Sequence, residues 1–162
     1  MAIITLNNNS LSSVTALPAG VGGKVLQVVS ASSTNVVSTS TTTMVEYMNT
    51  SITPSSTSSK IYAHFTGLGY ANGTNTAFDL RLIRGSISGG SVIGTVIGRT
   101  YSYDGGNSWE TVNLTTSILD TPSTTSSQQY TIGFSPDNNN FCNCGKSGNP
   151  STLTLMEIAG WL

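Results

Sequence analysis

The acidic pair Asp104 and Glu110 is the arrangement in this chain that comes nearest to an enzyme's active site. These residues flank "GGNSW", and two neighbouring carboxylates are what glycoside hydrolysis requires. The same stretch also reads as ordinary turn chemistry, which predicts a solvated turn instead. The one histidine, His64, alternates with Tyr62 and Thr66, and no acid is placed to complete a serine triad. Because nucleotide-binding and nucleophile-elbow motifs are also absent, we expect that the chain is not an enzyme.

Two cysteines and an asparagine-rich segment are the candidates for a metal site. Cys142 and Cys144 form a lone C-x-C, and adding His64 would give only three zinc ligands. On an extended strand the two thiols would share a face, and we expect them to be inert. "DNNN" begins at Asp137 and offers calcium a single carboxylate, which is too few. The sequence therefore predicts neither a metal nor a cofactor.

An aromatic loop is the candidate for ligand or partner contact. "RTYSYDGGNSWE" (99–110) contains Tyr101, Tyr103 and Trp109. Their rings could stack on sugars or fill a pocket of a partner, as aromatic side chains do at recognition sites. The alternative is that they pack into the protein core or between subunits.

Composition excludes several other classes of protein. The chain has 162 residues, enough for one domain, with 8% charged residues and a formal net charge of −1. Its six basic residues are scattered, so there is no footprint for nucleic acid. No apolar run is long enough to span a membrane, and the first twenty residues make a poor signal peptide.

Period-two patterns recur along the chain and predict strands. In "AFDLRLIR", Phe78, Leu80 and Leu82 would face inward, with Asp79 and Arg81 outward. The predicted strands are 24–30, 44–48, 60–68, 77–84, 91–98, 111–118, 129–135 and 151–162. With no helical stripe, about eight strands predict an all-β fold, a single jelly-roll-like antiparallel β-sandwich. Residues 1–23 would form a short N-terminal arm for attachment, and residues 24–162 the sandwich domain.

A nearly repeated phrase separates some of these strands. "TPSSTSS" (53–59) and "TPSTTSS" (121–127) look like linkers, but strand-like runs border both copies. Pro54 and Pro122 fix φ and donate no ladder hydrogen bond, which ends a strand. We expect each copy to carry the chain between strands over the edge of the sandwich, at matching points of its two halves.

Apolar residues on both faces of some strands predict self-association. "VLQVV" and "LTLMEI" do not alternate cleanly, and a lone sandwich should have a polar outer face. A covering arm or another subunit would hide the second face, and we favour a homo-oligomer. The candidate interface residues are Leu26, Val28, Met156, Ile158, Trp161 and Leu162.

Several phrases together resemble one family of virion proteins from tailed phages, cyanobacterial phages among them. The phrases are "GVGGKVLQVVSAS", "SITPSSTSSKIYAHF", "DLRLIRGS", "ILDTPSTTSSQQYTIGF" and "STLTLMEIAGW", and the resemblance runs from Gly20 to the end. It implies a trimeric β-sandwich that serves as a capsid decoration (cement) protein or as the distal head of a tail fibre or tailspike. No catalytic residues come with it.

The short arm favours the decoration protein over the receptor-binding head of a fibre. A fibre usually has a long shaft, and 23 residues are too few for one at about 3.3 Å per residue. The expected function is therefore a homotrimeric decoration protein on the outer capsid surface. Its expected partners are further copies of itself and the phage major capsid protein, with host-surface glycans as a further candidate.

Overall fold

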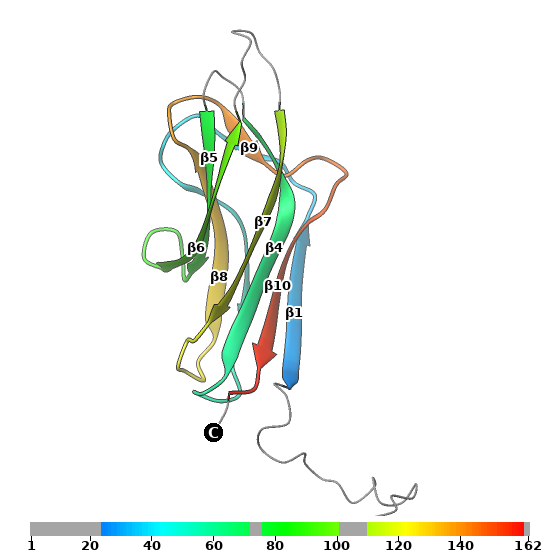
Figure 1. Ribbon diagram of the computed structural model, residues 1–162, viewed down its shortest axis with the longest axis vertical. Helices are drawn as coiled ribbons and strands as arrows, with labels where there is room; N and C mark the ends of the chain where they lie inside the picture. Colours follow the sequence, from blue (N-terminus) through cyan, green and yellow to red (C-terminus); the bar gives the residue numbers. More distant parts are fainter. Residues whose placement is uncertain (1–23, 72–75, 101–109, 161–162) are drawn as a thin grey trace, which may run out of the picture.

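The period-two patterns of the sequence form ten β-strands and no helix in the structure, a computed structural model that describes residues 24–71, 76–100 and 110–160 (Figure 1). The strands are β1 (Val25–Ser33), β2 (Val37–Thr39), β3 (Val45–Ile52), β4 (Lys60–Ala71), β5 (Thr76–Arg84), β6 (Ser91–Thr100), β7 (Glu110–Asp120), β8 (Gln128–Pro136), β9 (Cys142–Cys144) and β10 (Ser151–Ile158). No helix in these ranges has the length and apolar character needed to cross a bilayer.

The predicted all-β sandwich is confirmed, with two more strands than expected. Each of the eight predicted segments corresponds to a long strand, and the additional strands are the three-residue β2 and β9. These two pair with each other, and β9 also pairs with the end of β4. Strands of three residues depend on pairing with their neighbours, so the local sequence pattern does not predict them.

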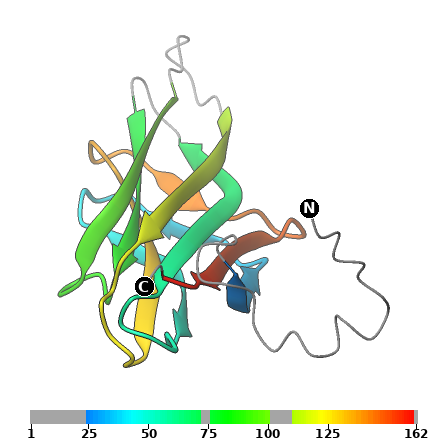
Figure 2. The ribbon, with the colours of Figure 1, turned by 60° about the horizontal axis from the view of Figure 1, so that its bottom comes forward.

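The ten strands form two antiparallel sheets (Figures 1 and 2). Sheet A has the order β1-β10-β4-β9-β2, and β7 pairs with β4 along its length. Since β7 occupies one side of β4, β10 and β9 share the other side. Sheet B has the order β3-β8-β5-β6.

The pairing is nested, which is the jelly-roll arrangement. Within the sheets β5 pairs with β6, β4 with β7, β3 with β8 and β1 with β10. The eight long strands are therefore one long antiparallel hairpin, folded over so that successive strand pairs alternate between the sheets. The predicted jelly-roll topology follows from this register.

The core lies between the inner faces of the two sheets. Along β4, Ile61, Ala63 and Phe65 are inaccessible to solvent, while the residues between them are not. From sheet B, Tyr130 and Phe134 face them and are also fully buried. In β5 the predicted alternation holds for Leu80 and Leu82, which are buried, whereas the outward Asp79 and Arg81 form an ion pair of 2.6 Å.

The two Thr-Pro-Ser loops cross between the sheets, as the sequence predicted. The first loop (53–59) joins β3 of sheet B to β4 of sheet A, and the second loop (121–127) joins β7 of sheet A to β8 of sheet B. Because β3 pairs with β8 and β4 with β7, the loops occupy matching positions at one end of the sandwich.

Sheet B has its outer face partly covered by its own chain. At Gly133 in β8 an added Cβ would lie 2.5 Å from Ile87 Cδ1 and 2.8 Å from Met44 Sδ. Next to it, the Thr131 hydroxyl donates to the Gly85 carbonyl at 2.7 Å and is fully buried. The turn between β5 and β6 therefore shields part of sheet B.

Candidate functional site

The outer face of sheet A brings together apolar residues that point away from the core on their strands. The strand register places Val28 of β1 beside Met156 of β10, Met156 beside Tyr62 of β4, and Tyr62 beside Leu119 of β7. We call these four residues the apolar row. It crosses the four long strands of sheet A from edge to edge.

The apolar row is exposed in the single chain. Val28 is 56% and Leu119 51% accessible, and Met156 and Tyr62 are half-buried. Ile158, two residues beyond Met156 on β10, is half-buried, and Val25, its partner on β1, is exposed. Scattered apolar residues are normal on a protein surface, but a continuous set marks a contact site.

Beyond the apolar row the same face is rich in hydroxyl groups. The Ser30 and Thr154 hydroxyls lie 3.2 Å apart, as do those of Ser32 and Thr152. The ring of His64 stacks on Tyr62 with a centroid separation of 6.2 Å. Thr and Ser suit an exposed pleat, and they add no charge to the surface.

Lys60 is the one Lys, Arg, Asp or Glu that points outward from the described parts of β1, β10, β4 and β7. Two copies of this face could therefore meet with little like-charge repulsion. Burying one such apolar side chain completely contributes about 1.5–3 kcal/mol relative to leaving it exposed. Part of this free energy can still be gained on association, because the side chains of the apolar row are only partly buried in the single chain.

A buried carboxylate fixes the strand that carries Met156. Glu157 points inward, is inaccessible to solvent, and accepts hydrogen bonds from Ser55 N at 2.7 Å, Ser55 Oγ at 2.6 Å and Gln27 Nε2 at 2.6 Å. Burial raises the pKa of this carboxyl, but the hydrogen bonds, those from Ser55 above all, outweigh it and hold the pKa at about 2. The carboxylate thus ties the first loop to sheet A.

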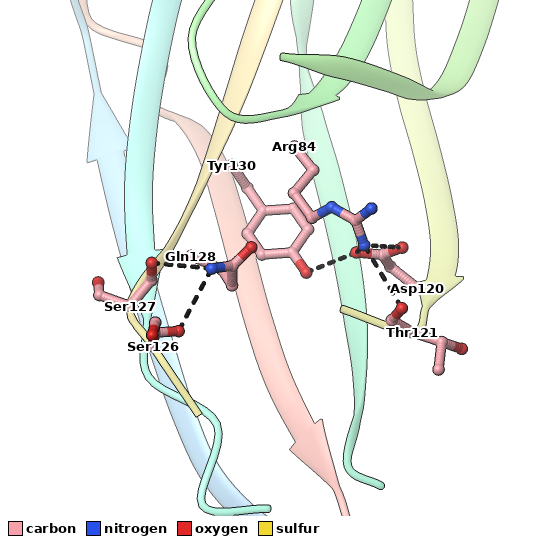
Figure 3. A network of polar contacts seen from close by, with 7 residues as sticks. All are labelled: Arg84, Asp120, Thr121, Ser126, Ser127, Gln128 and Tyr130. Carbon is pink, nitrogen blue, oxygen red and sulfur yellow. Dashed lines mark hydrogen bonds and ion pairs between the residues drawn. The ribbon is translucent and has the colours of Figure 1, made fainter. Parts of the chain in front are cut away.

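A second carboxylate does the same for the strand that carries Leu119 (Figure 3). Arg84 Nη1 lies 3.0 and 2.9 Å from the two oxygens of Asp120, and the Tyr130 hydroxyl donates to Asp120 Oδ2 at 2.8 Å. Burial, followed by the hydrogen bond to Asp120, raises the pKa of Tyr130. Since Arg84 and Tyr130 belong to sheet B and Asp120 to sheet A, the network joins the sheets beneath one end of the apolar row.

The second loop (121–127) lies at the same end of the molecule, where Gln128 at the start of β8 contacts it. Gln128 Nε2 donates to the carbonyl oxygens of Ser126 at 3.3 Å and Ser127 at 3.0 Å (Figure 3). The contacts of Glu157 with the first loop and of Asp120 with sheet B therefore fix the ends of the strands that carry Met156 and Leu119. An interface built there loses little conformational freedom on association.

The two cysteines lie on one side of β9, facing the core. Cys142 and Cys144 are both fully buried and both free thiols. Burial raises the pKa of Cys142 to about 12, and burial also raises that of Cys144. These features fit the inert thiols that the sequence predicted. In the described ranges no group of three or more His, Cys, Asp or Glu side chains is arranged to hold a metal ion.

The structure assembles part of the predicted site. Val28, Met156 and Ile158 share one face, where Ile158 pairs with Val25, whereas Leu26 lies at the bulge between Val25 and Gln27 and has no partner in the register. The predicted interface residues Trp161 and Leu162 lie outside the described residues. The aromatic candidates Tyr101, Tyr103 and Trp109 also lie outside them, together with Asp104. Tyr62 and Leu119 were missed, because only the strand register shows that they continue the row.

Comparisons with known proteins leave the family open. No family model matches the chain, and no curated protein sequence matches it. The structure of the Eiger TNF from S. frugiperda is similar, with a TM-score of 0.40 and 11% identity over 62% of this chain and 60% of that one. The VP2 subviral particle of infectious bursal disease virus gives a TM-score of 0.39 and 12% identity over 82% of this chain and 38% of that one.

The Gx strain of infectious bursal disease virus gives a TM-score of 0.35 and 8% identity, over 84% of this chain and 33% of that one. The chain thus covers less than two thirds of the length of each of these structures. Similarity at this level fixes neither a family nor a function.

Proposed function

We propose that the chain is a structural virion protein of a tailed phage, a homotrimeric decoration protein that stabilises the outer capsid surface. The observation that carries the proposal is the apolar row, an exposed apolar strip on a nearly uncharged sheet whose strand ends are fixed. The resemblance of the sequence to phage virion proteins supports the assignment to a phage particle.

Self-association through sheet A is the first element of the proposal. Sheet B has part of its outer face covered by Ile87 and Met44, whereas the apolar row of sheet A is exposed in the described chain. Three copies that bury their rows against one another would remove this apolar surface from water. Residues 1–23 would contact the major capsid protein, and the loop with Tyr101, Tyr103 and Trp109 would contact host-surface glycans.

Charge placed in the apolar row tests the assembly surface. Leu119→Lys combined with Met156→Lys should abolish the trimer in sedimentation velocity at low micromolar concentration. Val92→Lys is the matched control, since Val92 is 49% exposed on β6 of sheet B. A trimer that survives the double substitution, with circular dichroism unchanged, would contradict an interface at the row.

The number of copies in a virion tests the location. A decoration protein is present in hundreds of copies and raises the resistance of the head to heat, so densitometry of purified particles should give a strong band. The alternative, a receptor-binding head of a tail fibre, predicts few copies and inhibition of adsorption by the free protein. That second result would overturn the capsid assignment.

A further inference from the structure

Strand β1 has a free edge. It lies at the end of sheet A, next to β10, and β10 is its one strand partner in the described chain (Figures 1 and 2). An edge strand presents a row of unpaired N–H and C=O groups, which is a template for another strand.

The free backbone groups of β1 can be assigned from the ladder. Ala159 N donates to Lys24 O at 2.9 Å, so this pair is a hydrogen-bonded one, and hydrogen-bonded pairs alternate along an antiparallel ladder. Past the bulge between Val25 and Gln27, the alternation turns the N–H and C=O groups of Val28, Ser30 and Ser32 away from β10. The hydroxyl contacts of 3.2 Å from Ser30 and Ser32 to β10 agree, since side chains approach most closely in non-hydrogen-bonded pairs.

β1 also lacks the devices that protect sheet edges from pairing. Proteins blunt such edges with charges, prolines, bulges or very short strands. β1 is nine residues long, contains no charged residue or proline, and has its bulge at its beginning. The other described edge strands are protected: β3 by Glu46 and a bulge, β7 by Asp120 at its end, β6 by a bulge at Ile93, and β2 by its three-residue length.

We propose that β1 pairs with β1 of a second copy, antiparallel and about a two-fold axis at Ser30, so that two sheets A become one continuous sheet. A second copy is the occupant that this edge fits best. Around a two-fold axis the same strand of each copy pairs with itself, so a charged strand would bring like charges together. β1 has no charged residue and meets this condition.

In this register Ser30 faces Ser30 of the second copy and Val28 faces Ser32. The three outward residues of each strand then exchange about six backbone hydrogen bonds. The inference deepens the proposed function and rests on it in one respect: a two-fold contact at β1 would link separate trimers over the capsid surface, while the apolar row would hold each trimer together.

A single cysteine at the axis tests the pairing. In a hydrogen-bonded antiparallel pair the Cα atoms lie about 5.5 Å apart, within the range that a disulfide spans. Ser30→Cys should therefore form a covalent dimer on mild oxidation at low micromolar concentration. The native Cys142 and Cys144 are buried with raised pKa values, so they should not compete.

Ser51→Cys is the matched control, because Ser51 is an exposed serine on β3, an edge strand of sheet B that belongs to neither proposed contact. Pre-positioned thiols should cross-link at least about tenfold faster than thiols that meet by diffusion. Dimer formation at equal rates in Ser30→Cys and Ser51→Cys would overturn the inference.

Removing the N–H at the axis gives a second readout. Ser30→Pro deletes an outward donor and leaves the ladder to β10 complete, as proline does at a sheet edge. In sedimentation equilibrium the unmodified protein should show species larger than its basic unit, and Ser30→Pro should show the basic unit alone. Larger species that persist in Ser30→Pro would also overturn the inference.

The two proposals fail in distinguishable ways. A trimer that shows no larger species and no Ser30→Cys dimer contradicts the β1 contact and leaves the decoration-protein proposal intact. A protein that dimerises through Ser30→Cys but never forms a trimer contradicts the trimer and leaves the β1 contact intact.

Discussion

Glu157→Gln should destabilise the fold strongly, even though the substitution keeps the size and shape of the side chain. Glu157 is fully buried and accepts three hydrogen bonds, two of them at Oε1 from Ser55 and one at Oε2 from Gln27. In the described part of the chain no ion pair reaches it. Neutral donors alone therefore stabilise its charge.

The size of the effect follows from the partners. A glutamine carbonyl at the Oε1 position can still accept both bonds from Ser55, but the bonds weaken because the acceptor is neutral. Its amide group would then face the Gln27 amide, which cannot rotate freely because its Nε2 also donates to Thr53 O at 2.7 Å. One charged hydrogen bond is lost and two are weakened, partly offset by the removal of a buried charge, which gives a loss of about 2–3 kcal/mol.

The destabilisation caused by Glu157→Gln should depend on pH, whereas that of a simple packing defect would not. The folded pKa of Glu157 is about 2, below its ordinary value of 4.5, so its ionised form stabilises the folded state above pH 4.5. That stabilisation is lost as the pH falls from 4.5 toward 2. The difference between the natural protein and Glu157→Gln should therefore be largest at neutral pH and shrink in this window.

Urea unfolding at fixed protein concentration, at pH 7 and pH 3, measures both quantities. Glu46→Gln is the matched control because Glu46 is exposed, and it should change the free energy of unfolding by less than about 0.5 kcal/mol. If Glu157→Gln matches the natural protein at pH 7, or if the difference is the same at both pH values, the assigned role of the buried carboxylate is refuted.

Three further outcomes follow from other contacts. Tyr130→Phe removes the hydroxyl that donates to Asp120 and should lower the free energy of unfolding by about 1.5–3 kcal/mol in urea titrations, and a change near zero would contradict the bridge between the sheets. Gly145→Ala should unfold at a lower temperature than Gly148→Ala, because both glycines have positive φ but only at Gly145 would a Cβ collide with a backbone carbonyl; equal melting temperatures would refute this. With its pKa raised to about 12, Cys142 should react with a thiol reagent at pH 8 about 1,000-fold more slowly in the folded protein than in urea, and rapid labelling of the native state would contradict its burial.

The strands could be predicted because their signal is local. The alternation in "AFDLRLIR" and "KIYAHF" determines which side chains enter the core, and the structure agrees at Leu80, Leu82, Ile61 and Phe65. The prolines of the two loops end the preceding strands whichever strands those pair with. Neither signal depends on knowing the neighbours.

The apolar row and the anchoring carboxylates depend on pairing and were harder to foresee. Tyr62 and Leu119 join Val28 and Met156 only because of the register across three strand pairs. A weaker signal did exist for Glu157, since it shares the parity of the inward Leu153 and Leu155 and so had to be buried. Its donors on β1 and in the first loop, far away in sequence, gave no signal of their own.

The nested pairing of the strands has a consequence for how the chain is made. The tip of the long hairpin is the turn between β5 and β6, where Gly85 adopts a φ of 102° and Gly90 N donates to Ser86 O at 2.8 Å. From this tip each later pair joins segments farther apart along the chain, until Gln27 meets Glu157 across a separation of 130 residues. At about 5–20 residues per second of synthesis, β1 leaves the ribosome on the order of ten seconds before β10 exists. During that interval β1 has no native strand partner, and both edges of this uncharged strand can pair with other chains.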